Sequence, residues 1–248
     1  MITFLYKNLI DKVSSISENS GANTFGTEYL HDHDINSVFR GADTSIGTTT
    51  LLFSFGSAVY MDSVACVTNL TSIGTLIVRA GVSSSVADQA FGVPLDGLGT
   101  SYKFFGNYGY QYWRLDLYGV TGIGKHQVNE VFLGKRLPIN QMPTYPMGNS
   151  MEEDTVELTS ERGQKWIYPN FERENWVFNF ESVNATTEND LYKMYRYCGK
   201  NTQPFWMNLN LDDNANNIRY VRFKENSFLS EEITKNTFDI SLEIESEV

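Results

Sequence analysis

Two of the three histidines fall in one short acidic run, Glu28-Tyr29-Leu30-His31-Asp32-His33-Asp34. Calcium prefers oxygen ligands such as carboxylates, and zinc readily accepts imidazole nitrogens. The candidate metal ligands in this run are Glu28, His31, Asp32 and Asp34. A structural calcium ion is one interpretation. The other is a solvated loop in which the acidic side chains cap backbone groups, and the residues alone leave both open.

Residues 119–126 have the G-x-x-x-x-G-K spacing of a phosphate-binding loop. His126 stands where Ser or Thr would bind the magnesium ion, and the residues after it predict a strand rather than a helix. We therefore interpret this run as a glycine-rich loop between two strands. Residues 212–217 contain two Asp and three Asn, but they lack the glycine and the terminal Glu of a calcium-binding loop. They predict a polar hairpin turn.

Sequence motifs for hydrolysis are absent, since the chain has neither G-x-S-x-G nor H-E-x-x-H. The two cysteines, Cys66 and Cys198, are far apart and have no His neighbour that would activate a thiolate. Both fall in segments with the pattern of regular structure, so they predict buried free thiols rather than a disulfide. We expect no enzymatic activity.

The chain is acidic, with 19 Lys and Arg against 30 Asp and Glu and a net charge of −11 over 248 residues. Nucleic acids and anionic membranes are unfavourable partners for such a chain. No stretch approaches the roughly 18 apolar residues that a membrane span requires, and the first residues lack the pattern of a secretory signal. We expect a soluble protein that binds no nucleic acid and does not insert into membranes.

The pattern of Pro and Gly divides the chain in two. Residues 138–150 contain three Pro and one Gly without helical or strand periodicity, which predicts a linker. Residues 1–137 carry a net charge of −2 and residues 138–248 carry −9. The predicted domains are therefore residues 1–137 and 151–248.

Short β-branched and aromatic runs separated by turn residues fill the first domain, and no long window has a helical period. Such spacing is typical of an antiparallel β-sandwich. In the second domain, Trp176, Phe178 and Phe180 alternate with smaller or polar residues, which predicts a strand. A helix follows, with Thr187 and Asp190 as a capping box and Gly199 as its stop. Its apolar residues recur at helical spacing: Leu191, Met194, Tyr195 and Cys198.

Three further strands are expected at residues 204–209, 218–223 and 237–244. In the last, Phe238, Ile240, Leu242 and Ile244 alternate with polar residues. The fold class is therefore mainly β, with an N-terminal sandwich and a small C-terminal α+β domain in which one helix packs on an antiparallel sheet.

Two resemblances extend this reading. Residues 30–39 and 51–56, with the Trp113 strand and residues 128–134, resemble a discoidin-like (coagulation factor 5/8 type C) jelly-roll domain. Residues 152–248 resemble the C-terminal domain of tailed-bacteriophage tail-tip proteins. The motifs behind this second resemblance are Gly163-Gln164, the strand at 176–180, the helix end Tyr197-Cys198-Gly199, Pro204-Phe205-Trp206, and the strands at 220–223 and 238–245.

The second resemblance implies a distal tail or baseplate protein that forms a homo-oligomeric ring, contacts other tail proteins and links tail tube to tip. Its location would be the virion, after synthesis in the host cytoplasm. The alternative is a carbohydrate-binding module that attaches to host-surface glycans, because jelly-roll domains often present aromatic platforms to sugars. The candidate surface residues for a glycan or partner are Phe104, Tyr108 and Tyr110, and burial in a core or interface is the competing reading of these side chains.

Overall fold

The computed structural model describes residues 2–19, 26–43, 48–70, 74–95, 100–119, 125–144, 148–160, 164–209 and 218–247. The chain forms two compact units that interleave along the sequence. Residues 2–138 and 206–218 form the first, which we call the jelly-roll unit. Residues 139–205 and 219–247 form the second, which we call the helix unit. The predicted linker 138–150 contains the end of one strand and the start of another, and the predicted domain boundaries stay a prediction.

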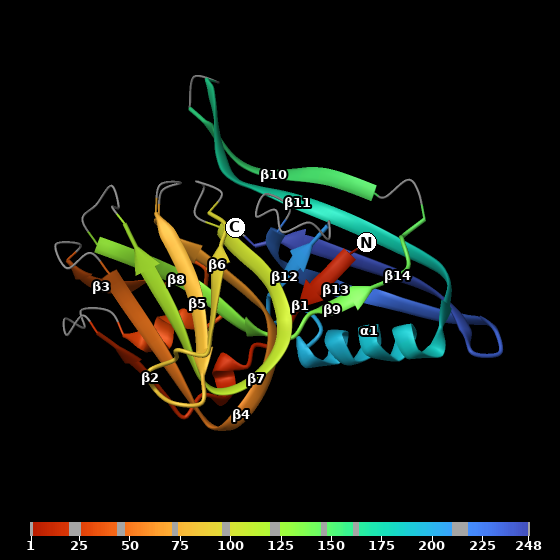
Figure 1. Cartoon of the computed structure of the whole chain (residues 1–248). Helices are drawn as coiled ribbons and strands as arrows, with labels where there is room; N and C mark the ends of the chain where they lie inside the picture. The colour runs from red at the N-terminus through yellow and green to blue at the C-terminus, as the bar shows by residue number, and fades with distance from the viewer. Residues whose placement is uncertain are drawn as a thin grey trace. The chain divides into compact units, whose positions relative to one another are not determined.

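The jelly-roll unit is an antiparallel sandwich, as predicted (Figure 1). Its elements are β1 (Ile2–Leu5), η1 (Ile10–Lys12), β2 (Ser15–Glu18), η2 (Thr27–Leu30), β3 (Phe39–Asp43), β4 (Thr48–Thr68), β5 (Thr75–Gly81), β6 (Gln89–Val93), β7 (Thr100–Tyr118), β8 (Lys125–Gly134), β9 (Leu137–Ile139) and β12 (Phe205–Asn208). The sandwich strands follow the order β3-β8-β4-β7-β5-β6, with β2 paired to β4. A shorter run of strands has the order β12-β1-β9.

Two long strands, β4 and β7, build both layers of the sandwich. Their register shifts between Ser54 and Val59 and again between Met61 and Ser63. Before the first shift β4 also pairs with β2, and after the second it pairs with β8. Alternate side chains of these strands point inward and form a core that includes Leu51, Phe53, Trp113, Leu115 and Leu117.

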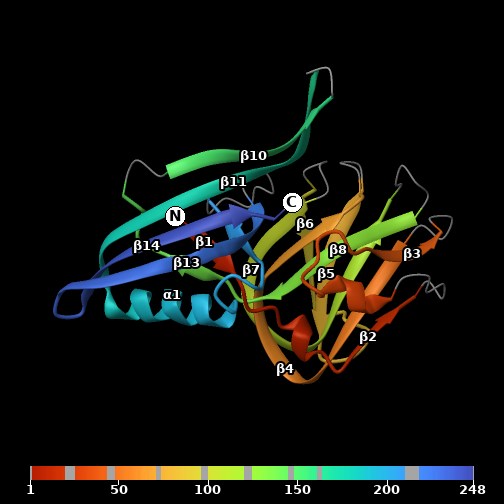
Figure 2. The ribbon, with the colours of Figure 1, turned by 180° about the vertical axis from the view of Figure 1, so that it is seen from behind.

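The helix unit places one helix on an antiparallel sheet of order β10-β11-β14-β13. Its elements are β10 (Gly148–Thr159), β11 (Lys165–Asn184), α1 (Ala185–Tyr197), β13 (Ile218–Thr234) and β14 (Thr237–Ser246). Figure 2 shows α1 running along β13 and β14. The predicted alternation in β11 is confirmed, because Trp176, Phe178 and Phe180 are buried.

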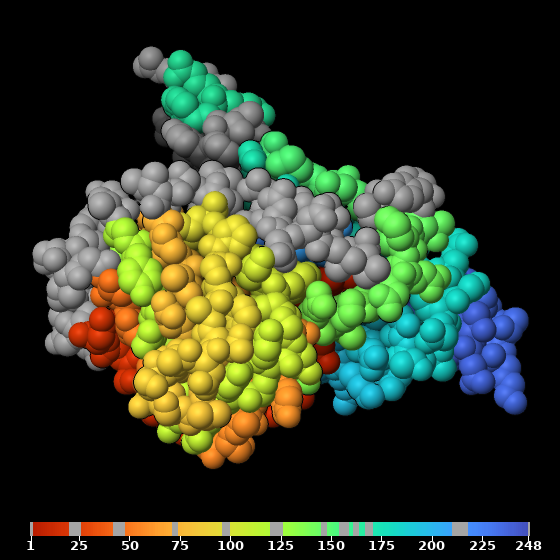
Figure 3. Space-filling model, in the orientation of Figure 1, coloured from red at the N-terminus to blue at the C-terminus, as the bar shows by residue number. Residues whose placement is uncertain are grey.

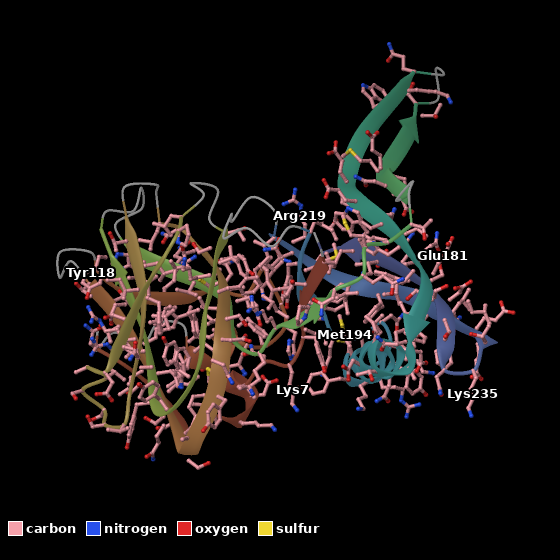
Figure 4. All side chains as sticks on the ribbon, turned by 45° about the vertical axis from the view of Figure 1, so that its right-hand side comes forward. Lys7, Tyr118, Glu181, Met194, Arg219 and Lys235 are labelled. Carbon is pink, nitrogen blue, oxygen red and sulfur yellow. The ribbon has the colours of Figure 1, made fainter. Side chains whose placement is uncertain are left out.

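The helix packs through the residues predicted for its apolar face. Leu191, Met194 and Tyr195 are buried, and the Tyr195 ring lies 5.2 Å from the Phe223 ring of β13. Met194 is labelled on α1 in Figure 4. Gly199 ends the helix in the left-handed region, at φ +59°, as predicted.

The predicted start of the helix is wrong by three residues. The N-cap is Asn184, whose side-chain oxygen accepts a hydrogen bond from the Thr187 backbone N–H at 2.9 Å. Asn is as good a cap as Asp or Ser, and the strand β11 runs directly into it. Thr187 lies inside the first turn.

Cys66 and Cys198 are buried free thiols, as predicted. Burial raises the pKa of each thiol to about 12. In the described ranges, no helix combines the length and apolarity needed to cross a membrane. The hairpin turn predicted at 212–217 lies outside the described residues.

Candidate functional site

The four predicted metal ligands occupy η2 and the loop that follows it. Glu28 belongs to η2. Asp32 and Asp34 turn toward the backbone of their own loop. The Asp34 N–H donates to Asp32 Oδ1 at 3.0 Å, and the Asn36 N–H donates to Asp34 Oδ1 at 2.9 Å. These contacts are the capping role that the solvated-loop interpretation expects.

His31 faces a different partner. Its Nδ1 lies 3.4 Å from Oδ1 of Asp11, which comes from η1. In the part of the chain that the structure describes, no three His, Cys, Asp or Glu side chains meet in the arrangement of a metal site. The structure therefore does not gather Glu28, His31, Asp32 and Asp34 around one point.

Glu130 is the residue beside this loop that sequence reasoning missed. It lies in β8, is only 2% exposed, and its Oε2 has no hydrogen-bond partner in the described structure. Burial, followed by the nearby charge of Asp32, raises its pKa to about 9, although the His33 backbone bond acts in the opposite direction. Asp11 and Asp34 add smaller contributions that also raise the pKa.

A buried carboxylate among other carboxylates is a costly arrangement unless a proton or a cation neutralises it. Glu130 Oε2 has no hydrogen-bond partner, and calcium prefers oxygen ligands, but in the described residues Glu130 does not meet two other acidic side chains as a metal site would require. Calcium at this loop stays a prediction. The signal in the sequence was a carboxylate among the apolar residues of a predicted strand, Asn129-Glu130-Val131-Phe132.

The three predicted surface aromatics fall into two groups. Phe104 contacts the Tyr102 ring edge-on at 4.4 Å, and the guanidinium carbon of Arg136 lies 4.6 Å from the centre of its ring. Tyr108 and Tyr110 belong to a second group, with ring centres 6.4 Å apart. The structure therefore does not group Phe104 with Tyr108 and Tyr110, as the sequence analysis did.

The second group forms a row of rings on β6 and β7, which we call the aromatic row: Phe91, Phe105, Tyr108, Tyr110 and Trp113. Phe91 stacks on Phe105 at 4.6 Å and contacts Tyr108 at 5.3 Å. Trp113 is buried, and the other four are half-buried against the core. Residues of β5, β6 and β7 make up much of the yellow surface in Figure 3. The row therefore packs against the core and keeps four partly exposed side chains.

The structure agrees with our rejection of a phosphate-binding loop. β8 begins at Lys125, so the residues after the glycine-rich run form a strand and not a helix. His126 is buried, with Nδ1 2.7 Å from Thr49 Oγ1 and Nε2 3.0 Å from the Gly119 carbonyl oxygen. Burial lowers its pKa. Both ring nitrogens therefore have hydrogen-bond partners within the jelly-roll unit.

No family model matches the chain, and no curated protein matches it. Several solved structures are similar over about half of it. The tandem CBM32 domains of Clostridium perfringens ZmpB, in complex with GalNAc, are 14% identical with a TM-score of 0.41; the match covers 51% of this chain and 34% of that one. A chitosan-binding module from a Paenibacillus chitosanase/glucanase is 16% identical, with a TM-score of 0.42 over 51% of this chain and 98% of that one.

The lectin binding domain of Lectinolysin, in complex with Lewis b, is 12% identical, with a TM-score of 0.43 over 53% of this chain and 98% of that one. All three are sugar-binding domains by their descriptions. With TM-scores below 0.5, the three likenesses carry no conclusion about what this chain binds.

Proposed function

We propose that this chain is a non-enzymatic structural protein of a tailed-phage virion, whose copies assemble into a symmetric ring at the distal tail or baseplate and link tail tube to tip. The resemblance of residues 152–248 to tail-tip proteins suggested this function. One structural observation supports an assembly role independently, and it concerns the hairpin formed by β10 and β11.

This hairpin is longer than the sheet that carries it. β11 pairs with β14 from Asn175 to Asn184, whereas β10 pairs with β11 as far as Thr159 and Lys165. Residues 151–159 and 165–174 therefore form a two-stranded segment, which we call the projecting ribbon. Figure 1 shows it leaving the sheet.

A two-stranded ribbon is at best marginally stable in water without a third strand or a packed face. Two large apolar side chains of the projecting ribbon are exposed, Met151 at 61% and Trp166 at 44%. In addition, β10 is an edge strand of the described sheet, and an edge offers unpaired backbone groups to another chain. These features favour a ribbon that is completed by a neighbouring copy.

Ring closure would require each copy to present two different, complementary surfaces. The projecting ribbon supplies one of them. The native mass of the full-length protein, measured over a concentration series up to about 100 µM, tests the proposal. A discrete trimer or hexamer supports it, and a strict monomer over the whole series contradicts self-assembly into a ring.

Glycan binding by the jelly-roll unit is the second candidate function. The observation that favours it is the aromatic row, in which Tyr108 and Tyr110 are only half-buried, with ring centres 6.4 Å apart. Aromatic side chains with a polar tip are well suited to sugar-like ligands, which combine apolar and hydroxyl-bearing surface. A glycan array with the full-length protein and with Tyr108→Ala tests this function. Hits that the variant loses support it, and a blank array contradicts it.

A further inference from the structure

A pocket of about 350 Å³ lies in the jelly-roll unit. Its lining is Lys7, Leu9, Lys12, Val59, Tyr60 and Lys135. Half of these residues are lysines, in a chain whose net charge is −11. We call it the lysine pocket.

The three ammonium groups are not neutralised by neighbouring carboxylates. In the described structure, Lys7, Lys12 and Lys135 are exposed, and none lies within ion-pair distance of Asp or Glu. The nearby acids already have partners. Asp11 contacts His31 at 3.4 Å, and Asp62 accepts a bond from the Arg136 backbone N–H at 2.9 Å. The pocket therefore carries a local positive charge.

Tyr60 gives the pocket a flat apolar surface. Its side chain is 57% exposed, and its ring lies against the backbone of Gly109, the paired residue on β7. A Cβ at position 109 would come within 2.7 Å of the ring carbon Cε1, so glycine at this position lets the ring lie flat. The Lys135 ammonium is 5.5 Å from the ring centre, a cation–π distance.

The backbone that carries the lysines is held firmly in place. Asn8, the residue after Lys7, forms a bridge with Gly134, the residue before Lys135. The Leu9 N–H donates to the Leu133 carbonyl at 2.9 Å. Lys7, which Figure 4 labels, and Lys135 therefore come from two segments that this antiparallel bridge pairs. The positions of Lys7 and Lys135 are therefore fixed by backbone pairing.

We propose that the lysine pocket binds an acidic saccharide unit, in which a carboxylate or phosphate group meets the lysines and a sugar ring lies beside Tyr60. The volume suits a small ligand, at the lower end of the range for ligand pockets. A lysine ammonium is a compact charge on a flexible side chain. It can therefore reach an anionic group of a sugar whose ring lies against Tyr60. This inference does not rest on ring assembly, and none of the residues that line the pocket belongs to the aromatic row.

Calorimetric titration of the full-length protein at 50 mM salt tests the proposal. The probes are trigalacturonic acid, which supplies carboxylates, glucose 6-phosphate, which supplies phosphate, and maltotriose, which is neutral. We expect at least one acidic probe to bind, and its affinity to fall as salt is raised because the contacts are partly screened. Which acidic probe binds distinguishes carboxylate from phosphate recognition.

Variants locate the binding site. Lys7→Gln, Lys12→Gln and Lys135→Gln should each weaken binding about five-fold or more, as expected for loss of one charged contact, and Tyr60→Ala should weaken it as well. Lys235→Gln is the matched control. It removes the same charge from the turn between β13 and β14 (Figure 4) and should leave affinity unchanged.

Three results would overturn the proposal. The first is no binding of either acidic probe at 50 mM salt. The second is equal binding of maltotriose, which would mean that charge plays no part. The third is an equal loss of affinity in Lys235→Gln, which would mean that attraction is spread over the whole surface. Unchanged melting temperatures of the exposed-lysine variants would exclude misfolding as the cause of any loss.

Discussion

The side-chain amide of Asn8 donates a hydrogen bond to the carbonyl oxygen of Val131 at 2.7 Å, across 123 positions in the sequence. The Asn8 oxygen in turn accepts from the Leu133 N–H at 3.1 Å and from the Ile10 N–H at 3.2 Å. One buried side chain therefore ties the N-terminal segment, which carries Lys7 of the lysine pocket, to β8.

Asn8→Ala should lower the free energy of unfolding by about 1–3 kcal/mol, because it leaves buried backbone groups without partners. Chemical denaturation measures this loss. Asn19→Ala is the control, since Asn19 also bonds the backbone of another segment but is exposed; its effect should be clearly smaller. Equal losses of stability in the two variants would contradict a special role for the buried hydrogen bonds of Asn8.

Much of the fold follows from sequence patterns that are local. The alternation in β11 and β14 and the spacing of Leu191, Met194 and Tyr195 each report which face of an element is buried, so these elements could be predicted. The projecting ribbon could not, because residues 151–159 are largely polar and acidic, and only Val156 and Leu158 alternate with polar residues. The pairing of β1 with β12 depends on contacts across about 200 residues, which no local pattern reports.

The acidic loop was also predicted only in part, because sequence patterns report local neighbours and not contacts made by the fold. Asp32 and Asp34 stand in one loop and are visible as a cluster in the sequence, whereas Glu130 joins them only through the fold. Phe104 and Phe105 are adjacent in sequence, but neighbouring strand residues point to opposite faces. Phe105 therefore belongs to the aromatic row, and Phe104 packs against Tyr102 and Arg136.

The pKa of Glu130 makes stability depend on pH. Its folded-state pKa is about 9 against 4.5 for an ordinary Glu, so between these values the folded state holds a proton that the unfolded state has released. In chelator, the free energy of unfolding should therefore fall as pH rises from about 5 to 9. Thermal unfolding across this range measures it.

Calcium should reduce this fall, because a bound cation would stabilise the ionised carboxylate in place of the proton. Glu130→Gln should remove both the pH dependence over this range and any stabilisation by calcium. Glu225→Gln, at an exposed position, should change neither. A melting temperature that is unaffected by millimolar calcium at pH 8 would contradict the cation site at this loop.

Asp116 should be among the most sensitive polar positions of the jelly-roll unit. It is 1% exposed and lies 2.8 Å from the Nε atoms of both Arg79 and Arg114. Asp116→Asn would leave two guanidinium groups close together without their carboxylate, at a cost of about 3 kcal/mol, the lower end for a buried pair because the arginines are partly exposed. Asp190→Asn, whose carboxylate lies in an exposed pair on α1, should cost about 0.5 kcal/mol or less.

The start of α1 can be tested by a pair of substitutions. Asn184→Ala should destabilise the helix unit by about 1 kcal/mol, because it removes the side-chain oxygen that accepts the Thr187 N–H. Thr187→Ala should have little effect, since the contact uses the Thr187 backbone. Denaturation followed by helical circular dichroism compares the free energies of unfolding of the two variants. A larger loss in Thr187→Ala would indicate that Thr187 and not Asn184 is the N-cap.

The most direct test of ring assembly removes the projecting ribbon and leaves the sheet intact. Glu152 and Arg173 are register partners, so residues 153–172 can be replaced by an Asn-Gly turn that joins them. We predict that the full-length protein forms a discrete oligomer by native mass spectrometry, and that the shortened protein is monomeric with its helical signal and cooperative unfolding preserved. An oligomer of the same size in both proteins, or a full-length monomer at 100 µM, would contradict assembly through the projecting ribbon.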